Sequence, residues 1–154
     1  ILSSDGHHMS DIDLDDPNWE RRAYDKFRAY GASKTANVLH MVELNRRYAE
    51  DGVQAVAVHP GVVGTSLARY MTREDFGALR SMAADNRDRG AVLDTILSPE
   101  QGAATQVWAA TTAELDGAGS VYLADCAIRT DVAAYAMDEH HAARLWEISE
   151  TLCG

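Results

Sequence analysis

Tyr30 and Lys34, four positions apart, pair a phenol with an ammonium group, a combination that suits proton transfer. The chain has six tyrosines but only two lysines, so chance would produce this spacing in about one such chain in a dozen. On a helix the two side chains share a face, and a cation beside a phenol favours the tyrosinate. Such a tyrosine can serve as a general acid or base near neutral pH. A surface tyrosine lying against a lysine stem is the alternative interpretation that the pair alone leaves open.

The elements around this pair follow from the apolar pattern. Apolar residues predict a long helix from Tyr30 to Glu50, and Gly52 suits the left-handed position after it. The β-branched run Val53–Val58 predicts a buried parallel strand, which His59-Pro60-Gly61 ends because proline cannot continue a hydrogen-bond ladder. Ile1–Ser4 resemble the last residues of another strand. Ligands bind at the carboxyl ends of parallel strands, so we expect a site there.

The remainder of the chain continues this alternation of helices and strands. A long excursion, Val62–Leu97, includes a short helix near Arg73–Ala84. Ser98 predicts the cap of a helix that ends near Thr112, a short strand follows at Gly119–Leu123, and Asp138 predicts the cap of a last helix. The order indicates an α/β layered domain.

Composition excludes several classes of protein. The net charge of -10 over 154 residues argues against a nucleic-acid partner, and no apolar run is long enough to predict a membrane span. Two cysteines, Cys126 and Cys153, make neither a disulfide framework nor a metal-type spacing, which indicates a reducing, cytoplasmic compartment. Because the chain opens within an apparent strand, we expect it to be the C-terminal part of a larger domain.

Tyr30-Gly31-Ala32-Ser33-Lys34, placed between a strand end at Ser3-Ser4 and the motif His59–Thr65, resembles the short-chain dehydrogenase/reductase family. The stretches 13–20 and 28–37 are similar to its retinol-dehydrogenase-like branch, and the similarity continues through 101–103 and 144–147. The resemblance implies a Rossmann-like, doubly wound parallel sheet. Residues 1–154 would then be the C-terminal part of one NAD(P)-binding domain whose N-terminal dinucleotide-binding half is absent here.

The resemblance also implies an oxidoreductase that transfers hydride between NAD(P) and a small carbonyl or alcohol substrate. Tyr30 would exchange a proton with the substrate oxygen, Lys34 would support Tyr30 and hold the nicotinamide ribose, and Ser4 would hydrogen-bond the substrate oxygen. Ser4 is preferred over Ser3, which would pack or bind backbone. The spacing between Ser4 and Tyr30 is longer than in the commonest members, as in the retinol-dehydrogenase-like branch.

The loop after the Val53–Val58 strand would line the nicotinamide end of the cofactor through Pro60, Gly61, Val63 and Thr65, with Thr65 contacting the carboxamide. Tyr30 and Lys34 would also contact the cofactor. The glycine-rich phosphate loop of the family is not found in this chain, so the sequence does not predict a preference between NAD and NADP. His59 is expected to end a strand and receives no catalytic role.

Other features lead to weaker expectations. Metal binding at His7-His8 is not expected, because neighbours in an extended chain point apart. The excursion predicts an apolar substrate pocket through Leu67, Met71, Phe76, Leu79 and Met82. The Tyr30–Glu50 helix predicts a homo-oligomer interface, with Val38, Met41 and Tyr48 facing a partner helix.

The alternative function is of a different class. The chain would then be a non-catalytic, truncated remnant that keeps part of the fold as a binding or assembly module. A reading frame upstream that encodes a strand and a glycine-rich turn would favour the enzyme.

Overall fold

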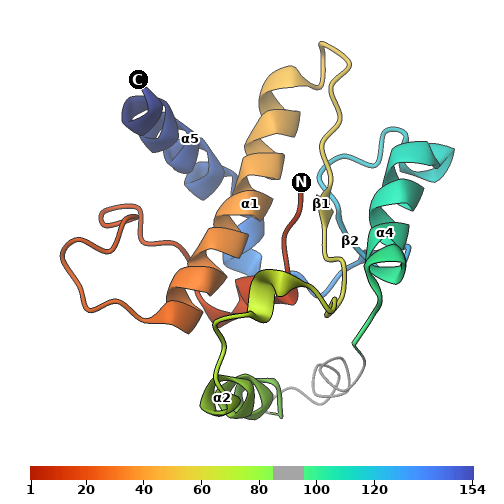
Figure 1. Ribbon diagram of the computed structural model, residues 1–154. Coiled ribbons are helices and arrows are strands. Elements are labelled where there is room, and N and C mark those ends of the chain that lie inside the picture. The colour runs from red at the N-terminus through yellow and green to blue at the C-terminus, as the bar shows by residue number, and fades with distance from the viewer. Residues whose placement is uncertain (85–95) are drawn as a thin grey trace.

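The computed structural model of the chain describes residues 1–84 and 96–154 and has a small sheet with helices on both faces (Figure 1). The strands, in sheet order, are β1 (Ala57–Val58), β2 (Tyr122–Ala124) and β3 (Ala127–Arg129). The α-helices are α1 (Lys26–Tyr48), α2 (Arg73–Ala84), α4 (Pro99–Thr111) and α5 (Glu139–Cys153). Short 3₁₀ helices are η1 (Asp5–Met9), η2 (Ser66–Ala68), η4 (Ala113–Leu115) and η5 (Ala134–Met137). The predicted α/β class is confirmed.

Two apolar clusters hold the layers together, one on each face of the sheet. Consecutive residues of a strand point to opposite faces. Ala57 accordingly packs with Leu39 of α1 and Leu145 of α5, whereas Val58 lies in a cluster that contacts Trp108 of α4. The sheet is thus covered by α1 and α5 on one face and by α4 on the other.

Local capping explains where the helices begin. α1 begins earlier than the predicted range Tyr30–Glu50, because the Asp25 carboxylate accepts the N–H groups of Phe27 at 3.0 Å and Arg28 at 2.9 Å. Gly52, with φ of 78°, follows the end of this helix in the predicted left-handed conformation.

The other helix predictions are confirmed. α2 has the predicted range, and α4 follows the predicted capping box at Ser98 and Gln101. The Asp138 carboxylate caps α5 by accepting the N–H of His141 at 2.7 Å. These signals are local in sequence, which is why they could be found without the fold.

The sheet differs from the prediction in two ways. β1 pairs with β2 in parallel, and Leu2 makes a parallel bridge to Val58, as expected. The predicted strand Val53–Val58 is nevertheless shortened, because the Asn45 side chain bonds both backbone polar groups of Ala55 at 2.7 and 2.8 Å in place of a neighbouring strand.

The second difference is a hairpin. The predicted strand Gly119–Leu123 is found as β2, and β3 returns antiparallel to it, so the sheet combines the predicted parallel pairing with one antiparallel pair. Asp125 and Cys126 form the connection with positive φ angles of 52° and 55°. Such turns usually carry Asn-Gly, and that sequence signal is missing here.

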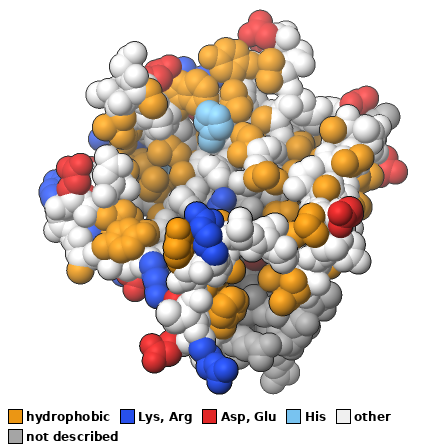
Figure 2. All heavy atoms as spheres, viewed as in Figure 1, with side chains coloured by type: hydrophobic (Ala, Val, Ile, Leu, Met, Phe, Trp, Pro, Cys, Tyr) orange, Lys and Arg blue, Asp and Glu red, His pale blue; other side chains and the backbone are white. Residues whose placement is uncertain are grey.

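The predicted oligomer face of α1 was wrong for Val38 and Met41 but not for Tyr48. Val38 and Met41 are fully buried within the chain, where α5 and η5 contribute to the same core cluster. Tyr48 is 38% exposed and lies beside Trp146 of α5. Figure 2 shows apolar side chains at many other points of the surface. An oligomer through α1 would have to use its exposed residues, and it stays a prediction.

In the described ranges 1–84 and 96–154, the helices are all too short or too polar to cross a membrane.

Candidate active site

Ser4 lies where the N-terminal segment leaves the sheet. The Ser3 N–H donates to the Val58 carbonyl at 2.8 Å, and Ser4 then caps η1 by accepting the Gly6 N–H on its Oγ at 3.1 Å. Since this bond uses only the oxygen, the Ser4 hydroxyl proton can still be donated to a ligand. Ser3, in contrast, is buried, and its Oγ donates to the Lys34 carbonyl at 2.9 Å. Ser3 therefore binds backbone, as expected.

Tyr30 and Lys34 are half-buried on one face of α1. The Lys34 Nζ atom lies 5.5 Å from the centroid of the Tyr30 ring. The hydrogen bonds and ion pairs found among the described residues use neither the Tyr30 hydroxyl nor Lys34 Nζ. Both polar ends thus remain available to a ligand from within that part of the chain.

Gly6 brings Ser4 and Tyr30 to the same place. A Cβ atom at Gly6 would lie 2.5 Å from Cε1 of Tyr30 and 3.4 Å from Oγ of Ser4. The Tyr30 ring therefore lies directly against the backbone of η1, next to the Ser4 hydroxyl. Ser4 and Tyr30 are 26 positions apart in the chain, and the structure places them in one cluster with Lys34.

A threonine that the sequence reasoning missed fixes η1 on α1. The Thr35 side chain is fully buried, and its Oγ1 lies 3.1 Å from the carbonyl oxygen of His7 and 2.8 Å from that of Ser10. Gly31, one turn earlier, allows close approach, since a Cβ there would lie 2.9 Å from Cβ of Met9. The sequence signal that could have revealed this contact is the small residue Gly31 followed four positions later by the short hydroxyl side chain of Thr35 on the predicted helix.

The loop after β1 leaves the sheet beside Ser4. Gly61 has φ of 84°, a conformation that glycine adopts without strain, and a Cβ there would lie 2.6 Å from Cδ1 of Leu97. Val63 pairs with Leu97 through a parallel bridge. Gly102 of α4 packs against the Val63 side chain, since a Cβ at Gly102 would lie 2.4 Å from Val63 Cγ2. Thr65 is exposed and caps η2 by accepting the Leu67 N–H at 3.3 Å.

Pro60, Gly61, Val63 and Thr65 thus occupy one continuous loop at the carboxyl end of β1. Ser4 is at the carboxyl end of the neighbouring segment, because Leu2 and Val58 pair in parallel. The loop residues and Ser4 therefore lie at the same, carboxyl end of the sheet.

His59 and Asp5 are the polar groups at this edge that sequence reasoning did not use. His59 is only 7% exposed, and its Nε2 lies 3.7 Å from Oδ2 of Asp5. Burial lowers the pKa of His59, and the Asp5 carboxylate opposes that change. The buried Tyr122 hydroxyl donates to Asp5 at 3.3 Å, and its burial raises the pKa of this phenol well above the ordinary value.

Asp5, His7 and His8 form a compact group whose potential ligand atoms lie within 4.8 Å of one another. The expectation that the two histidines point apart was wrong: η1 brings their rings within 3.8 Å. His7 is nevertheless fully buried, with Nδ1 at 2.8 Å from the Ser4 carbonyl and Nε2 accepting the Ala133 N–H at 3.3 Å. Both of its nitrogens have structural partners, so His7 fits a role in holding η1.

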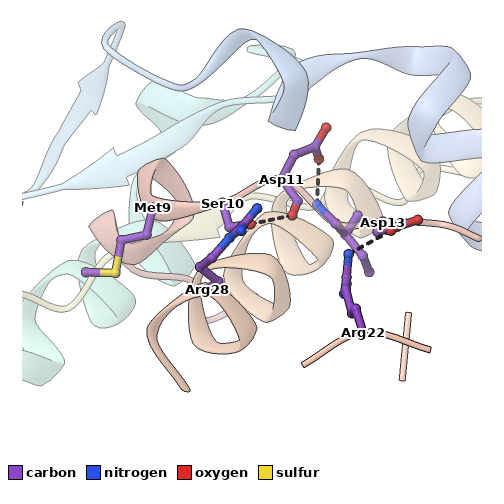
Figure 3. A pocket seen from close by; sticks show the side chains of 7 residues that line it. Met9, Ser10, Asp11, Asp13, Arg22 and Arg28 are labelled. Carbon is purple, nitrogen blue, oxygen red and sulfur yellow. Dashed lines mark hydrogen bonds and ion pairs between the residues drawn. The ribbon is translucent and has the colours of Figure 1, made fainter. Parts of the chain in front are cut away.

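The surface hollow in Figure 3 is lined by none of Ser4, Tyr30 and Lys34. It has a volume of about 390 Å³, and Arg22 donates across it to Asp13 at 2.7 Å. Its lining is mostly polar: Met9, Ser10, Asp11, Ile12, Asp13, Arg22 and Arg28. It is therefore not the apolar pocket that the sequence predicts.

The apolar residues predicted for that pocket belong to η2, α2 and their connection. Leu67 is 75% exposed and Phe76 is 49% exposed, so both are available to a substrate or another surface. Met71 and Leu79 are half-buried, and the side chain of Met82 lies outside the described residues.

Comparison with known proteins shows what the chain is similar to, although no family model matches it. It is 40% identical to a protein of Streptomyces lividans named "Probable oxidoreductase", over 96% of this chain and 52% of that protein. It is 34% identical to the short-chain dehydrogenase/reductase prx1 of Penicillium roqueforti, over 96% of this chain and 44% of that protein. It is also 34% identical to human retinol dehydrogenase 14, over 100% of this chain and 43% of that protein. The chain spans about half the length of the curated relatives it matches.

A solved structure agrees with these relatives. The crystal structure of an uncharacterised protein from Mycobacterium paratuberculosis matches 98% of this chain and 48% of that one, with a TM-score of 0.65 and 29% identity. The resemblance inferred from the motifs is therefore confirmed: over its whole length this chain is a relative of the short-chain dehydrogenases/reductases, the retinol dehydrogenases among them.

Proposed function

We propose that this chain is the C-terminal part of an NAD(P)-dependent short-chain dehydrogenase/reductase. Its reaction would be hydride transfer between the cofactor and a carbonyl or alcohol, through Ser4, Tyr30 and Lys34. The observation that carries the proposal is the contact of the Tyr30 ring and the Ser4 hydroxyl with Gly6, with Lys34 over the same ring. Relatives named as oxidoreductases support the reaction class.

The proposed fold is the C-terminal portion of a Rossmann-like, doubly wound domain. The parallel neighbours Leu2, β1 and β2, with helices on both faces, support it. Among the described residues Leu2 pairs with a strand only on its Val58 side, so further parallel strands would continue the sheet on its other side. The dinucleotide-binding half would supply those strands.

Each side chain has a distinct role in the proposed chemistry. Tyr30 donates a proton to the carbonyl oxygen of the substrate, or takes it from the alcohol in the reverse direction. The Lys34 ammonium stabilises the phenolate that Tyr30 becomes when it donates. The Ser4 hydroxyl donates to the same substrate oxygen, where negative charge develops, while Gly6 N–H holds Ser4 Oγ in place.

The loop Pro60–Thr65 suits the nicotinamide end of the cofactor, which supplies or accepts the hydride when bound. It follows directly after β1, at the carboxyl end where parallel sheets bind ligands, and Val63 offers an apolar contact. Lys34 Nζ, without a partner among the described residues, suits the ribose hydroxyls. Thr65 would bind the carboxamide through its hydroxyl.

The proposed substrate is a small, apolar aldehyde, ketone or alcohol. The exposed apolar side chains of Leu67 and Phe76, on η2 and α2, follow the cofactor loop in the chain and support this choice. An apolar surface there would exclude water from the reacting carbonyl.

An activity measurement tests the proposal. The full-length gene product should consume NADH or NADPH when supplied with apolar aldehydes or ketones, and reduce NAD or NADP with the matching alcohols. Omission of the carbonyl compound is the control and should stop cofactor consumption. A folded protein that turns over neither cofactor with any of these compounds would instead favour the non-catalytic binding or assembly module.

A further inference from the structure

His59 is a buried polar side chain that the proposed chemistry leaves without a role. Its side chain is 7% exposed, and neither ring nitrogen has a hydrogen-bond partner among residues 1–84 and 96–154. Buried polar groups in proteins are nearly always bonded, so an unbonded one calls for an explanation.

The carboxylate of Asp5 faces this ring. Its Oδ2 lies 3.7 Å from His59 Nε2, and its Oδ1 accepts the Tyr122 hydroxyl at 3.3 Å. The His59 contact is longer than a hydrogen bond by roughly 0.5–1 Å. A small movement of η1 toward β1 would therefore complete the bond.

The backbone hydrogen bonds of β1 end beside the Asp5–His59 pair. Ser3 N–H donates to the Val58 carbonyl, and His59 N–H donates to the Leu123 carbonyl, both at 2.8 Å. Pro60 has no N–H, so the backbone ladder ends there. Asp5 directly follows Ser4, and His59 directly precedes Pro60, so their side chains face each other just beyond the last backbone bonds between the two segments.

We propose that the Asp5–His59 pair positions Ser4 against the cofactor loop, an inference that rests on the proposed function. In the working enzyme, Nε2–H of His59 donates to Asp5 Oδ2. The separation between the Ser4 hydroxyl and the loop beginning at Pro60 is then fixed. His59 and Asp5 are positioning residues, because neither touches the reacting atoms.

The charges around His59 suit a neutral donor. Burial lowers its pKa and is the dominant effect; Asp5 of η1 and Asp125 of the hairpin raise it, and Arg129 of β3 lowers it. Tyr122 of β2 adds a hydroxyl on the Asp5 side. A neutral imidazole with its proton on Nε2 gives Asp5 a second donor without placing a second positive charge beside Arg129.

Kinetics of three variants test the positioning role in the full-length gene product. His59→Leu should lower kcat about tenfold or more and leave KM for NAD(P)H nearly unchanged, because misplacement of a catalytic group slows the chemical step. His59→Gln keeps an amide donor and should recover most of the lost kcat. His140→Leu, at an exposed histidine of α5, is the matched control and should match the wild type.

The double variant Asp5→Ala/His59→Leu tests whether the two residues act together. Its kcat should be no lower than that of the more impaired single variant, since each single change already breaks the pair. Losses that multiply, or a His59→Leu enzyme within about twofold of the wild type, would overturn the proposal.

Nitrogen NMR of the His59 imidazole separates this inference from the proposed function. The spectrum should show the proton on Nε2, and Asp5→Ala should shift that signal, whether or not a substrate is known. A proton on Nδ1, or no response to Asp5→Ala in a folded protein, would refute the pair itself. If the NMR result is positive but the wild type has no NAD(P)-dependent turnover, the proposed function fails, and the positioning role fails with it.

Discussion

The hydroxyl of Ser3 donates to the backbone carbonyl of Lys34 at 2.9 Å. The bond joins the strand end that carries Ser4 to the turn of α1 that carries Lys34. Because Ser3 is buried and also pairs through its N–H with Val58, it links β1, the Ser4 segment and α1 at one point. Adjacent serines thus differ: Ser3 belongs to the framework, and Ser4 is the proposed donor to the substrate oxygen.

This division predicts different effects for the two serines. Ser4→Ala should lower kcat by about 10²-fold, because it removes a donor to the substrate oxygen, and should lower the free energy of unfolding by about 1 kcal/mol, because Ser4 also caps η1. Ser3→Ala should lower the free energy of unfolding by about 1 kcal/mol, the net value of one hydrogen bond, and should reduce kcat less. Steady-state kinetics and chemical denaturation of both variants check this. A larger loss of kcat in Ser3→Ala than in Ser4→Ala would contradict the assignment.

Gly102 should control the shape of the cofactor loop. A Cβ at this position would lie 2.4 Å from Val63 Cγ2, so Gly102→Ala must displace Val63 and the loop that carries it. We expect weaker NAD(P)H binding and a stability loss of about 1–3 kcal/mol from overpacking. Titration of NAD(P)H fluorescence and thermal unfolding of the full-length gene product measure both.

The matched control is Gly77→Ala on α2, where a Cβ would meet no atom within 4 Å. Alanine is the better helix former, so this variant should be more stable by about 0.5–1 kcal/mol and should bind the cofactor normally. If Gly102→Ala behaves like Gly77→Ala, the close contact with Val63 has no functional effect.

Glu43 should make the fold sensitive to acid. Its carboxylate is fully buried and lies 2.6 Å from nitrogen atoms of both Arg46 and Arg47, and the hydrogen bond from Arg46 is the main reason that the pKa of Glu43 is lowered. A carboxyl group whose pKa is lowered by folding stabilises the fold at pH values above its unfolded-state pKa. This stabilisation disappears as the pH falls through the folded-state pKa.

Glu43→Gln should therefore lower the free energy of unfolding at pH 7 by about 1 kcal/mol or more. The difference from the wild type should begin to shrink once the pH falls below the ordinary carboxyl pKa of about 4.3, and it should disappear as the pH falls through the lowered folded-state pKa of Glu43. Denaturation curves at several pH values, with the exposed Glu114→Gln as control, measure it. A difference that is constant with pH would show that the Glu43 charge is not the cause.

Much of the fold could be predicted from local signals. Ser98 and Asp138 predicted the starts of α4 and α5, because a helix cap is formed by residues only three positions apart in the sequence. The early start of α1 was missed because Asp25 lies in a polar, turn-rich stretch where many residues could serve as caps. β3 was missed because Asp125 and Cys126 adopt positive φ angles that their sequence does not favour.

The site was less accessible to prediction. The Tyr30–Lys34 pair could be found because both residues lie on one helix, and its spacing is chemically distinctive. Contacts between distant segments could not be found from the sequence. The contacts of Thr35 with the His7 carbonyl and of His59 with Asp5 depend on how η1 lies on α1 and β1. Nothing in the sequence near His59 indicates that an aspartate 54 positions earlier would face its ring.

The central claim is most directly tested by Tyr30→Phe in the full-length gene product, which removes only the hydroxyl that exchanges the proton. Turnover should fall by about 10²–10⁴-fold, whereas the dissociation constant for NAD(P)H should stay nearly the same. Tyr24→Phe, at a tyrosine that is 71% exposed, is the matched control and should be fully active. Lys34→Ala should impair both turnover and cofactor binding, since Lys34 serves both. A purified, folded Tyr30→Phe protein that keeps more than half of the wild-type turnover would contradict the assignment of Tyr30 as the catalytic acid and base.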